Sequence, residues 1–220
     1  MREVFGKIIY DSIAEIVHPK HTCLLLVDVT NDFYSPQGYF AAQKRELSML
    51  QAMLPKLKQL LAEARRSGVM CIHLQNTVLP DGRSDSPSFY RYKDSTVEGI
   101  PVYTIEETWG WEFVDGFQPD NGEVVVKKHR PSGFVHTDLE QILRASGIKS
   151  VVVTGCTSEG CVQSTAIDAM YRDYYTVVVP ECIASYTDDL HNAALKWMKP
   201  KVELVGMSDI IDVWKKLRQP

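Results

Sequence analysis

KSVVVTGCTSEGCVQSTA, residues 149–166, is the stretch that decides the fold. Residues 149–154 form a short β-branched run typical of a buried strand. Small residues follow at 155–161, and a segment suited to a helix begins at about Cys161. A strand that passes through a tight turn into a helix is the unit from which parallel α/β sheets are built.

The same unit recurs on both sides of this stretch. Further apolar runs typical of strands lie at 22–27, 69–74, 123–126, 175–179 and 201–205. Helices are expected at 46–66, 137–146, 161–173 and 188–198, with a last helix capped by Ser208. Pro180 is expected to end the fifth strand, because proline cannot donate to a sheet ladder. The pattern predicts one domain over residues 1–220, a three-layer α/β/α fold with a six-stranded, mostly parallel sheet.

Residues 76–119 interrupt this regularity. The segment is rich in Gly, Pro, Ser and aromatic residues and is far longer than an ordinary connection. Segments of this kind are usually lids or binding loops, and the alternative is a surface excursion that packs on its own aromatic side chains. We expect a lid or insertion here.

Composition narrows the class of protein. The 220 residues are 45% hydrophobic and 24% charged, and no stretch approaches the ~18 consecutive apolar residues of a membrane span. The net charge of −4 is spread along the chain, which argues against nucleic acid as a partner. The first residues are charged where a secretory leader would be apolar, so a cytoplasmic location is expected. The five cysteines are an odd number in a chain too large to need disulfides, and reduced thiols are expected.

Cys161 is the first candidate for chemistry. A thiol at a helix N-terminus feels the positive end of the helix dipole, which predicts a lowered pKa and a reactive thiolate. Backbone N–H groups in the same turn could hold a developing oxyanion. Cys156 lies five residues earlier, so a redox pair or half of a metal site is an alternative, although the spacing is not Cys-x-x-Cys and no Cys/His cluster lies nearby.

Two other strand ends carry charged residues. Asp28 directly follows the apolar run 24–27, and Lys127, Lys128 and Arg130 follow 124–126. Reactive groups collect at the carboxyl ends of strands in parallel sheets. Taken alone, Asp28 could equally be a loop or cap residue, and the lysines could be a solvated loop.

Together the three strand ends resemble the isochorismatase-like cysteine hydrolases over nearly the whole chain. The family's Asp-x-x-x-Asp-Phe motif is matched by 28–33, and its Lys-x-Arg-x-Ser-x-Phe motif by 128–134. The most specific match is the small-residue turn 155–161, followed by Ala-x-Asp-Ala at 166–169. The resemblance implies a six-stranded parallel sheet and a catalytic set of Asp28, Lys128 and Cys161.

The resemblance also implies a mechanism. A cis peptide between Cys156 and Thr157 would present the Thr157 and Cys161 N–H groups as the oxyanion hole. Asp28 would accept the thiol proton, Lys128 would stabilise negative charge, and Cys161 would attack an amide or ureido carbonyl. Ammonia or an amine would leave, and water would hydrolyse the acyl-enzyme.

Within the family, the turn 154–162 is most similar to N-carbamoylsarcosine and maleamate amidohydrolases, with ureidoacrylate and biuret hydrolases close behind. These relatives act on small polar amides or ureido compounds and usually form homo-oligomers. Nicotinamidases carry a metal site with an Asp-x-His motif, but residues 76–82 contain no histidine, so neither a metal nor a cofactor is predicted. The alternatives are a nicotinamidase- or isochorismatase-type hydrolase and a non-catalytic or redox-thiol relative.

Candidates for substrate contacts are Asn31 and Phe33, because the backbone holds them near Asp28. Arg91 could clamp an anionic substrate, Trp109 could wall the pocket, and Phe134 closes the second motif. The wider set of candidates in the same regions comprises Arg83, Arg130, Phe89, Tyr90, Tyr92 and Trp111.

Overall fold

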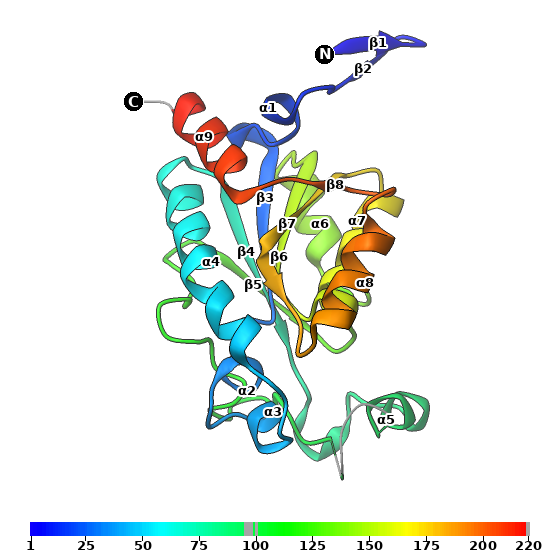
Figure 1. The fold of residues 1–220 in the computed structure, drawn as a ribbon. Coiled ribbons are helices and arrows are strands. Elements are labelled where there is room, and N and C mark those ends of the chain that lie inside the picture. Colours follow the sequence, from blue (N-terminus) through cyan, green and yellow to red (C-terminus); the bar gives the residue numbers. More distant parts are fainter. Residues whose placement is uncertain (95–98, 100, 219–220) are drawn as a thin grey trace.

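A six-stranded parallel sheet forms the centre of the molecule (Figure 1). The computed structural model describes residues 1–94, 99 and 101–218. In spatial order the strands are β5 (Val124–Lys128), β4 (Met70–Asn76), β3 (Thr22–Val27), β6 (Ser150–Cys156), β7 (Tyr175–Ala184) and β8 (Glu203–Leu204). Each neighbouring pair is parallel. The predicted fold class and the six predicted strands are therefore confirmed.

Helices cover both faces of the sheet (Figure 1). One face carries α4 (Ser48–Arg66) and α9 (Met207–Leu217), and the other carries α6 (Leu139–Ala145), α7 (Gln163–Tyr171) and α8 (Asp188–Met198). Side chains alternate along β3, so Leu24 and Leu26 enter the core beneath α4, and Cys23, Leu25 and Val27 enter the core beneath α7. Burial on both faces explains why this strand is continuously apolar.

Several short elements lie outside the repeating units, and the sequence did not predict them. They are β1 (Arg2–Val4), β2 (Lys7–Ile9), α1 (Ile13–Ile16), η1 (Pro19–His21), α2 (Asn31–Tyr34), α3 (Tyr39–Ala42), η2 (Pro80–Gly82), α5 (Pro87–Asp94) and η3 (Ser158–Val162). The strands β1 and β2 pair as an antiparallel hairpin that stands away from the sheet. The helices α2 and α3 lie side by side beyond the carboxyl edge of the sheet, where the site forms, and α5 lies beyond the same edge, apart from them.

Two expectations about element ends were wrong. Strand β7 continues through Pro180 to Ala184, because its pairing with β6 shifts from Val178 opposite Val153 to Ile183 opposite Gly155. Pro180 falls within this irregularity, where it need not donate a ladder hydrogen bond. Helix α9 begins at Met207 after Gly206, so Ser208 lies inside the first turn and is not the cap.

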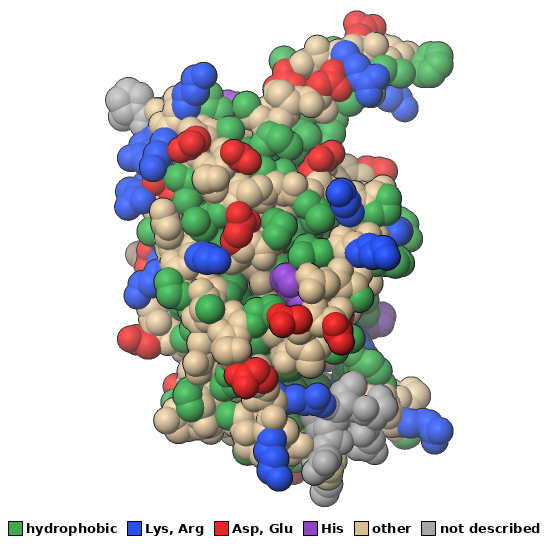
Figure 2. Space-filling model, in the orientation of Figure 1, with side chains coloured by type: hydrophobic (Ala, Val, Ile, Leu, Met, Phe, Trp, Pro, Cys, Tyr) green, Lys and Arg blue, Asp and Glu red, His purple; other side chains and the backbone are tan. Residues whose placement is uncertain are grey.

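The surface carries charges of both signs. Figure 2 shows acidic and basic side chains intermixed with apolar ones over the visible face. In the part of the chain that the structure describes, no helix is long and apolar enough to cross a bilayer.

Gly155 sets the distance between the two central strands at their carboxyl ends. It has φ of +104°, and a Cβ at this position would overlap the carbonyl group of Val27 on β3. Only glycine combines this backbone conformation with so close an approach. Because Asp28 directly follows Val27, the close approach holds the Asp28 backbone beside the turn that follows β6.

Replacing Gly155 with alanine tests this close approach. We expect Gly155→Ala to lower the free energy of unfolding by about 3 kcal/mol or more, since a positive-φ penalty adds to a backbone overlap. Gly68→Ala is the matched control, because Gly68 has φ of +68° and open space around the added methyl group. That control should cost about 1–2 kcal/mol in the same urea titration. Equal losses in the two variants would contradict the role given to Gly155.

Candidate active site

The ends of three strands bring Asp28, Lys128 and Cys161 together. Asp28 follows β3, Lys128 is the last residue of β5, and Cys161 lies in the turn after β6. Lys128 Nζ is 2.8 Å from Asp28 Oδ2 and 3.4 Å from Cys161 Sγ. The lysine ammonium thus lies between the carboxylate and the thiol, as the three motifs together predicted.

Asp28 is held from several directions. Its backbone has φ of +55°, and its N–H donates to the Leu74 carbonyl of β4 at 2.9 Å. The backbone N–H of Asn76 donates to Asp28 Oδ1 at 2.7 Å, and Oδ2 faces Lys128. Among the described residues, Oδ2 accepts no conventional hydrogen bond beyond the ion pair. This oxygen is therefore placed to receive a proton.

Lys128 is fully buried, as is Asp28. Burial acts to lower the pKa of the ammonium, but the charges of Asp28 and of an ionised Cys161 act the other way and leave the pKa above its ordinary value. Its Nζ also donates to the Arg130 carbonyl at 3.2 Å. Lys127 points to the surface and pairs with Glu106 at 2.7 Å, so the choice of Lys128 over Lys127 agrees with the geometry.

Cys161 occupies a turn that ends directly before α7. The peptide between Cys156 and Thr157 is cis, as the resemblance implied. Residues Ser158–Val162 form a π-type turn with a non-helical Gly160, and α7 starts at Gln163. The long helix expected from Cys161 is therefore a turn followed by a nine-residue helix.

The low pKa expected for Cys161 was wrong, because the groups around the thiol raise its pKa. Burial raises the pKa of the thiol to about 12, and the Asp28 carboxylate adds to the rise, while the Lys128 ammonium opposes it. Desolvation therefore outweighs the helix N-terminus. The resting group is a neutral thiol, which needs a base when it attacks, and Asp28 is the adjacent candidate.

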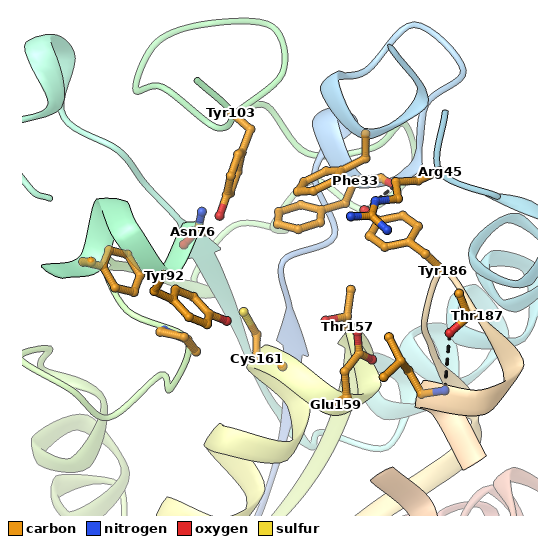
Figure 3. Close-up of a pocket in the computed structure, with 15 residues that line it drawn as sticks. Phe33, Arg45, Asn76, Tyr92, Tyr103, Thr157, Glu159, Cys161, Tyr186 and Thr187 are labelled. Carbon is orange, nitrogen blue, oxygen red and sulfur yellow. Dashed lines mark hydrogen bonds between the residues drawn. The ribbon is translucent and has the colours of Figure 1, made fainter. Parts of the chain in front are cut away.

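A pocket of about 380 Å³ opens above Cys161 (Figure 3). Five residues proposed from the sequence line this pocket: Phe33, Phe89, Tyr92, Thr157 and Cys161. Asn76, the last residue of β4, also lines the pocket, and the long segment after β4 contributes Phe89, Tyr92 and Tyr103. The remaining lining residues are Phe40, Arg45, Pro131, Glu159, Gly160, Tyr186, Thr187 and Leu190.

Four proposed substrate contacts lie outside this pocket. Asn31 uses its amide to donate to the Trp109 carbonyl at 2.9 Å, and the Trp109 side chain is 48% exposed. Arg91 is exposed on α5. Phe134 is buried in the core beneath α7 and packs near Tyr174. Proximity in sequence to Asp28 or to the second motif did not determine the direction of these side chains.

Several lining residues were missed at strand ends. Asn76 is the last residue of β4, and Tyr186 and Thr187 follow the end of β7. The strand-end rule that located Asp28 would have found them. Tyr186 was missed because β7 was expected to stop at Pro180, and Arg45 and Phe40 carry no comparable signal in the sequence.

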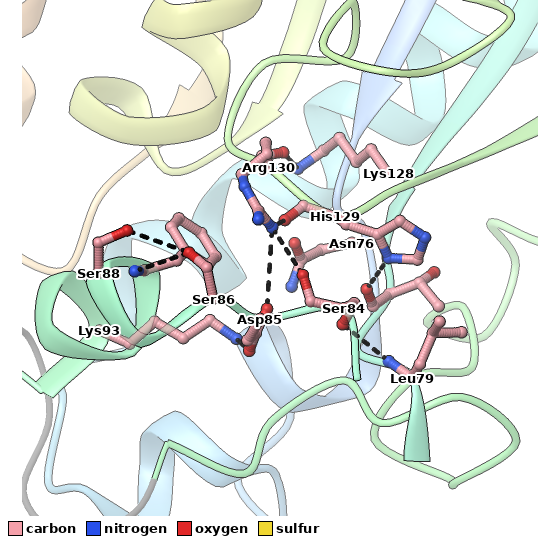
Figure 4. Close-up of polar contacts among 12 residues, drawn as sticks. Asn76, Leu79, Ser84, Asp85, Ser86, Ser88, Lys93, Lys128, His129 and Arg130 are labelled. Atoms are coloured by element: carbon pink, nitrogen blue, oxygen red, sulfur yellow. Dashed lines mark hydrogen bonds and ion pairs between the residues drawn. The ribbon is translucent and has the colours of Figure 1, made fainter. Parts of the chain in front are cut away.

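A buried ionic cluster fastens the long segment beside the site (Figure 4). Lys93 Nζ on α5 is 2.5 Å from Asp85 Oδ2, and both side chains are nearly inaccessible to solvent. Arg130 Nη1 donates to the Ser84 carbonyl at 3.0 Å and lies 3.9 Å from Asp85 Oδ1. The Arg130 guanidinium also lies over the Phe89 ring at 4.2 Å.

Arg130 therefore connects the pocket wall to Lys128. Its side chain holds Ser84 and Phe89 of the long segment, while its carbonyl accepts from Lys128. Sequence reasoning offered Arg130 as a clamp for an anionic substrate. In the structure it positions the wall instead and does not line the pocket.

The positions of the His, Cys, Asp and Glu side chains bear on the nicotinamidase alternative, which requires a metal site. Among residues 1–94, 99 and 101–218, no group of three or more His, Cys, Asp or Glu side chains is arranged to hold a metal ion. The segment where nicotinamidases would place ligands instead has the Asn76 amide donating to Thr104 Oγ1 at 2.7 Å.

Fold and site together define a three-layer α/β protein with a buried Asp–Lys–Cys cluster at the carboxyl edge of its sheet. A model of the isochorismatase domain matches residues 22–209. The chain therefore belongs to the isochorismatase family.

Individual relatives agree with this membership. Ureidoacrylate amidohydrolase RutB of Enterobacter sp. (strain 638) is 31% identical over 172 residues, which cover 74% of this chain and 75% of the relative. N-carbamoylsarcosine amidase from Thermoplasma acidophilum matches with a TM-score of 0.68 at 25% identity, over 85% of this chain and 96% of that chain. A cysteine hydrolase from Pseudomonas syringae pv. phaseolicola 1448A shares the fold, with a TM-score of 0.79 at 22% identity over 92% and 96% of the two chains.

The raised thiol pKa can be tested by alkylation. With a pKa of about 12, Cys161 should react with iodoacetamide at a rate that climbs from pH 6 to pH 11 without a plateau. Asp28→Asn should speed the reaction at a given pH, because the carboxylate raises the thiol pKa, and Lys128→Gln should slow it. Peptide mass spectrometry gives the rate at Cys161, and circular dichroism checks that each variant is folded. A plateau reached below pH 8 would instead indicate the low-pKa thiolate expected from the helix N-terminus.

Proposed function

We propose that this protein is a cysteine-dependent amidohydrolase that cleaves a linear amide or ureido C–N bond of a small molecule and releases ammonia. The observation that carries the proposal is the position of Lys128 Nζ, 2.8 Å from Asp28 and 3.4 Å from the Cys161 thiol at the base of a pocket. No metal or cofactor is part of the proposed reaction.

The first step is attack by sulfur. As Cys161 Sγ bonds to the substrate carbonyl carbon, its proton passes to Asp28. The neighbouring Lys128 ammonium offsets negative charge on the thiolate or the carboxylate. The N–H groups of Thr157 and Cys161 form the proposed oxyanion hole for the carbonyl oxygen, and both residues line the pocket.

The second step breaks the C–N bond. The tetrahedral adduct collapses, the leaving nitrogen takes the proton held by Asp28, and ammonia departs with a thioester left on Cys161. Water then attacks the thioester and gives a proton to Asp28, and that proton returns to sulfur as the acid is released. The same carboxylate serves as base and then acid in each half of the reaction, so it ends ionised and Cys161 ends as the thiol.

Two relatives support the C–N bond as the target. One is a ureidoacrylate amidohydrolase and another an N-carbamoylsarcosine amidase, both named for cleavage of a carbon–nitrogen bond. Isochorismatase-type cleavage of a vinyl ether needs no nucleophilic cysteine, so the Cys161 contact with Lys128 favours the amidohydrolase. A homo-oligomer and a cytoplasmic location stay predictions.

A redox-thiol or non-catalytic role is the competing function. Cys156 is buried, and its thiol donates to the Asp28 carbonyl at 3.6 Å. A redox role predicts a reversible Cys156–Cys161 disulfide, seen as a two-dalton mass loss after oxidation.

Ammonia release from a panel of primary amides and ureido compounds tests the proposal. We expect wild-type protein to release ammonia from at least one compound, and Cys161→Ala to lower kcat/KM by about 1000-fold or more, because the nucleophile is lost. Cys71→Ala is the matched control, since Cys71 is another buried thiol located on β4 and should keep its rate within about twofold. Equal rates in wild type and Cys161→Ala, or no ammonia from any compound, would contradict the proposed function.

A further inference from the structure

The pocket above Cys161 is walled mainly by aromatic rings. On one side, Phe33 stacks on Phe40 with centroids 4.9 Å apart, and Phe40 stacks on Tyr186 at 5.1 Å. Tyr103 packs against Phe40 at 4.9 Å and extends the same surface. All four side chains line the pocket, so they form one continuous aromatic wall.

A second aromatic surface comes from α5. Phe89 and Tyr92 stack with centroids 5.4 Å apart, and both line the pocket. Burial raises the pKa of Tyr92, and a negative charge on Cys161 adds to the rise. In the view of Figure 3, Tyr92 lies on one side of the Cys161 side chain, and Phe33 and Tyr186 lie on the other.

The charges of the lining do not select an anion. Arg45 and Glu159 are the charged lining residues among those described, and they have opposite signs. Glu159 Oε2 is buried and accepts no hydrogen bond from the described residues, so a substrate carboxylate near it would face an uncompensated negative charge. Lys128 lies beneath the pocket, where Asp28 already pairs with it.

We propose that the group attached to the scissile carbonyl is uncharged, apolar and flat, such as an aryl or arylalkyl group held between the two aromatic surfaces. This inference rests on the proposed hydrolysis at Cys161. It replaces the small polar substrate expected from the sequence by a hydrophobic amide. Planar groups gain both apolar burial and ring stacking in such a slot.

Three matched primary amides test this substrate class. They are 3-phenylpropanamide, propanamide and succinamate, which carry a phenyl group, a hydrogen and a carboxylate at the same position. We expect kcat/KM for 3-phenylpropanamide to exceed that for each of the other two amides by about 10- to 100-fold, because only this compound buries a phenyl ring in the pocket. Equal or better hydrolysis of propanamide or succinamate would overturn the inference and leave the hydrolase proposal intact.

Variants at Tyr92 separate the ring from its hydroxyl group. Tyr92 is 49% exposed, so its replacement should not disturb the core. We expect Tyr92→Ala to lower kcat/KM for 3-phenylpropanamide about 10-fold more than kcat/KM for propanamide, while Tyr92→Phe keeps the preference. Tyr171→Ala, at a 68% exposed tyrosine on α7 outside the pocket, is the control. An equal loss on both amides in Tyr92→Ala would contradict a role in recognising the ring.

A binding measurement keeps the two proposals distinct. Calorimetry with Cys161→Ala should show 3-phenylpropanamide binding at least 10-fold more tightly than succinamate, whether or not wild-type protein releases ammonia. If no amide is hydrolysed but this preference is found, the hydrolase proposal fails and the pocket assignment stands. If binding is absent or favours succinamate, the pocket assignment fails.

Discussion

The buried ion pair between Lys128 and Asp28 is the interaction on which the site depends. Both side chains are fully inaccessible to solvent, and Nζ and Oδ2 are 2.8 Å apart. Removing one member of a buried pair typically costs about 3–5 kcal/mol, because the other charge is left uncompensated. The pair is also supplied with backbone partners, the Asn76 N–H for the carboxylate and the Arg130 carbonyl for the ammonium. Hydrogen bonds of this kind lower the free-energy cost of burying the two charges, and they fix both side chains in one geometry.

The order of the strands positions the groups that surround this ion pair. The strand order β5-β4-β3-β6 places the ends carrying Lys128, Asn76, Asp28 and the Cys161 turn in succession along one edge. Gly155 allows Asp28 and the Cys161 turn to approach each other. Arg130 donates to the Ser84 carbonyl and so holds the long segment after β4 at the same edge. One consequence is a thiol buried enough to have a raised pKa beside a carboxylate that can take its proton. The ammonium between them can stabilise whichever of the two is ionised.

Much of this arrangement was predictable from the sequence, and the physical reasons are specific. Continuous β-branched runs such as 151–154 bury on both faces, and parallel strands place their carboxyl ends at one edge, so Asp28 and the Cys161 turn could be located. The motif resemblance then selected Lys128. The pKa of Cys161 was predicted with the wrong sign, because a local helix argument does not include desolvation by the chain packed around it.

The pocket wall was harder to predict, because it depends on contacts between distant segments. Phe40 and Tyr186 are far apart in sequence, and Tyr186 reaches the Phe40 ring from the end of β7, which continues past Pro180 through an irregular pairing. Trp109 and Phe134 were plausible from their neighbourhoods, yet one is exposed and the other belongs to the core beneath α7. Side-chain direction outside regular strands was thus the main information missing from the sequence.

The central claim is that Cys161 carries the acyl group during turnover. Acid quenching of the protein within milliseconds of mixing with its best amide substrate, followed by peptide mass spectrometry, addresses this directly. The account predicts a peptide containing Cys161 whose mass has increased by the acyl group of that substrate, formed in step with an initial burst of ammonia. Steady ammonia release with Cys161 unmodified at every time point, or with the acyl group on another residue, would contradict it.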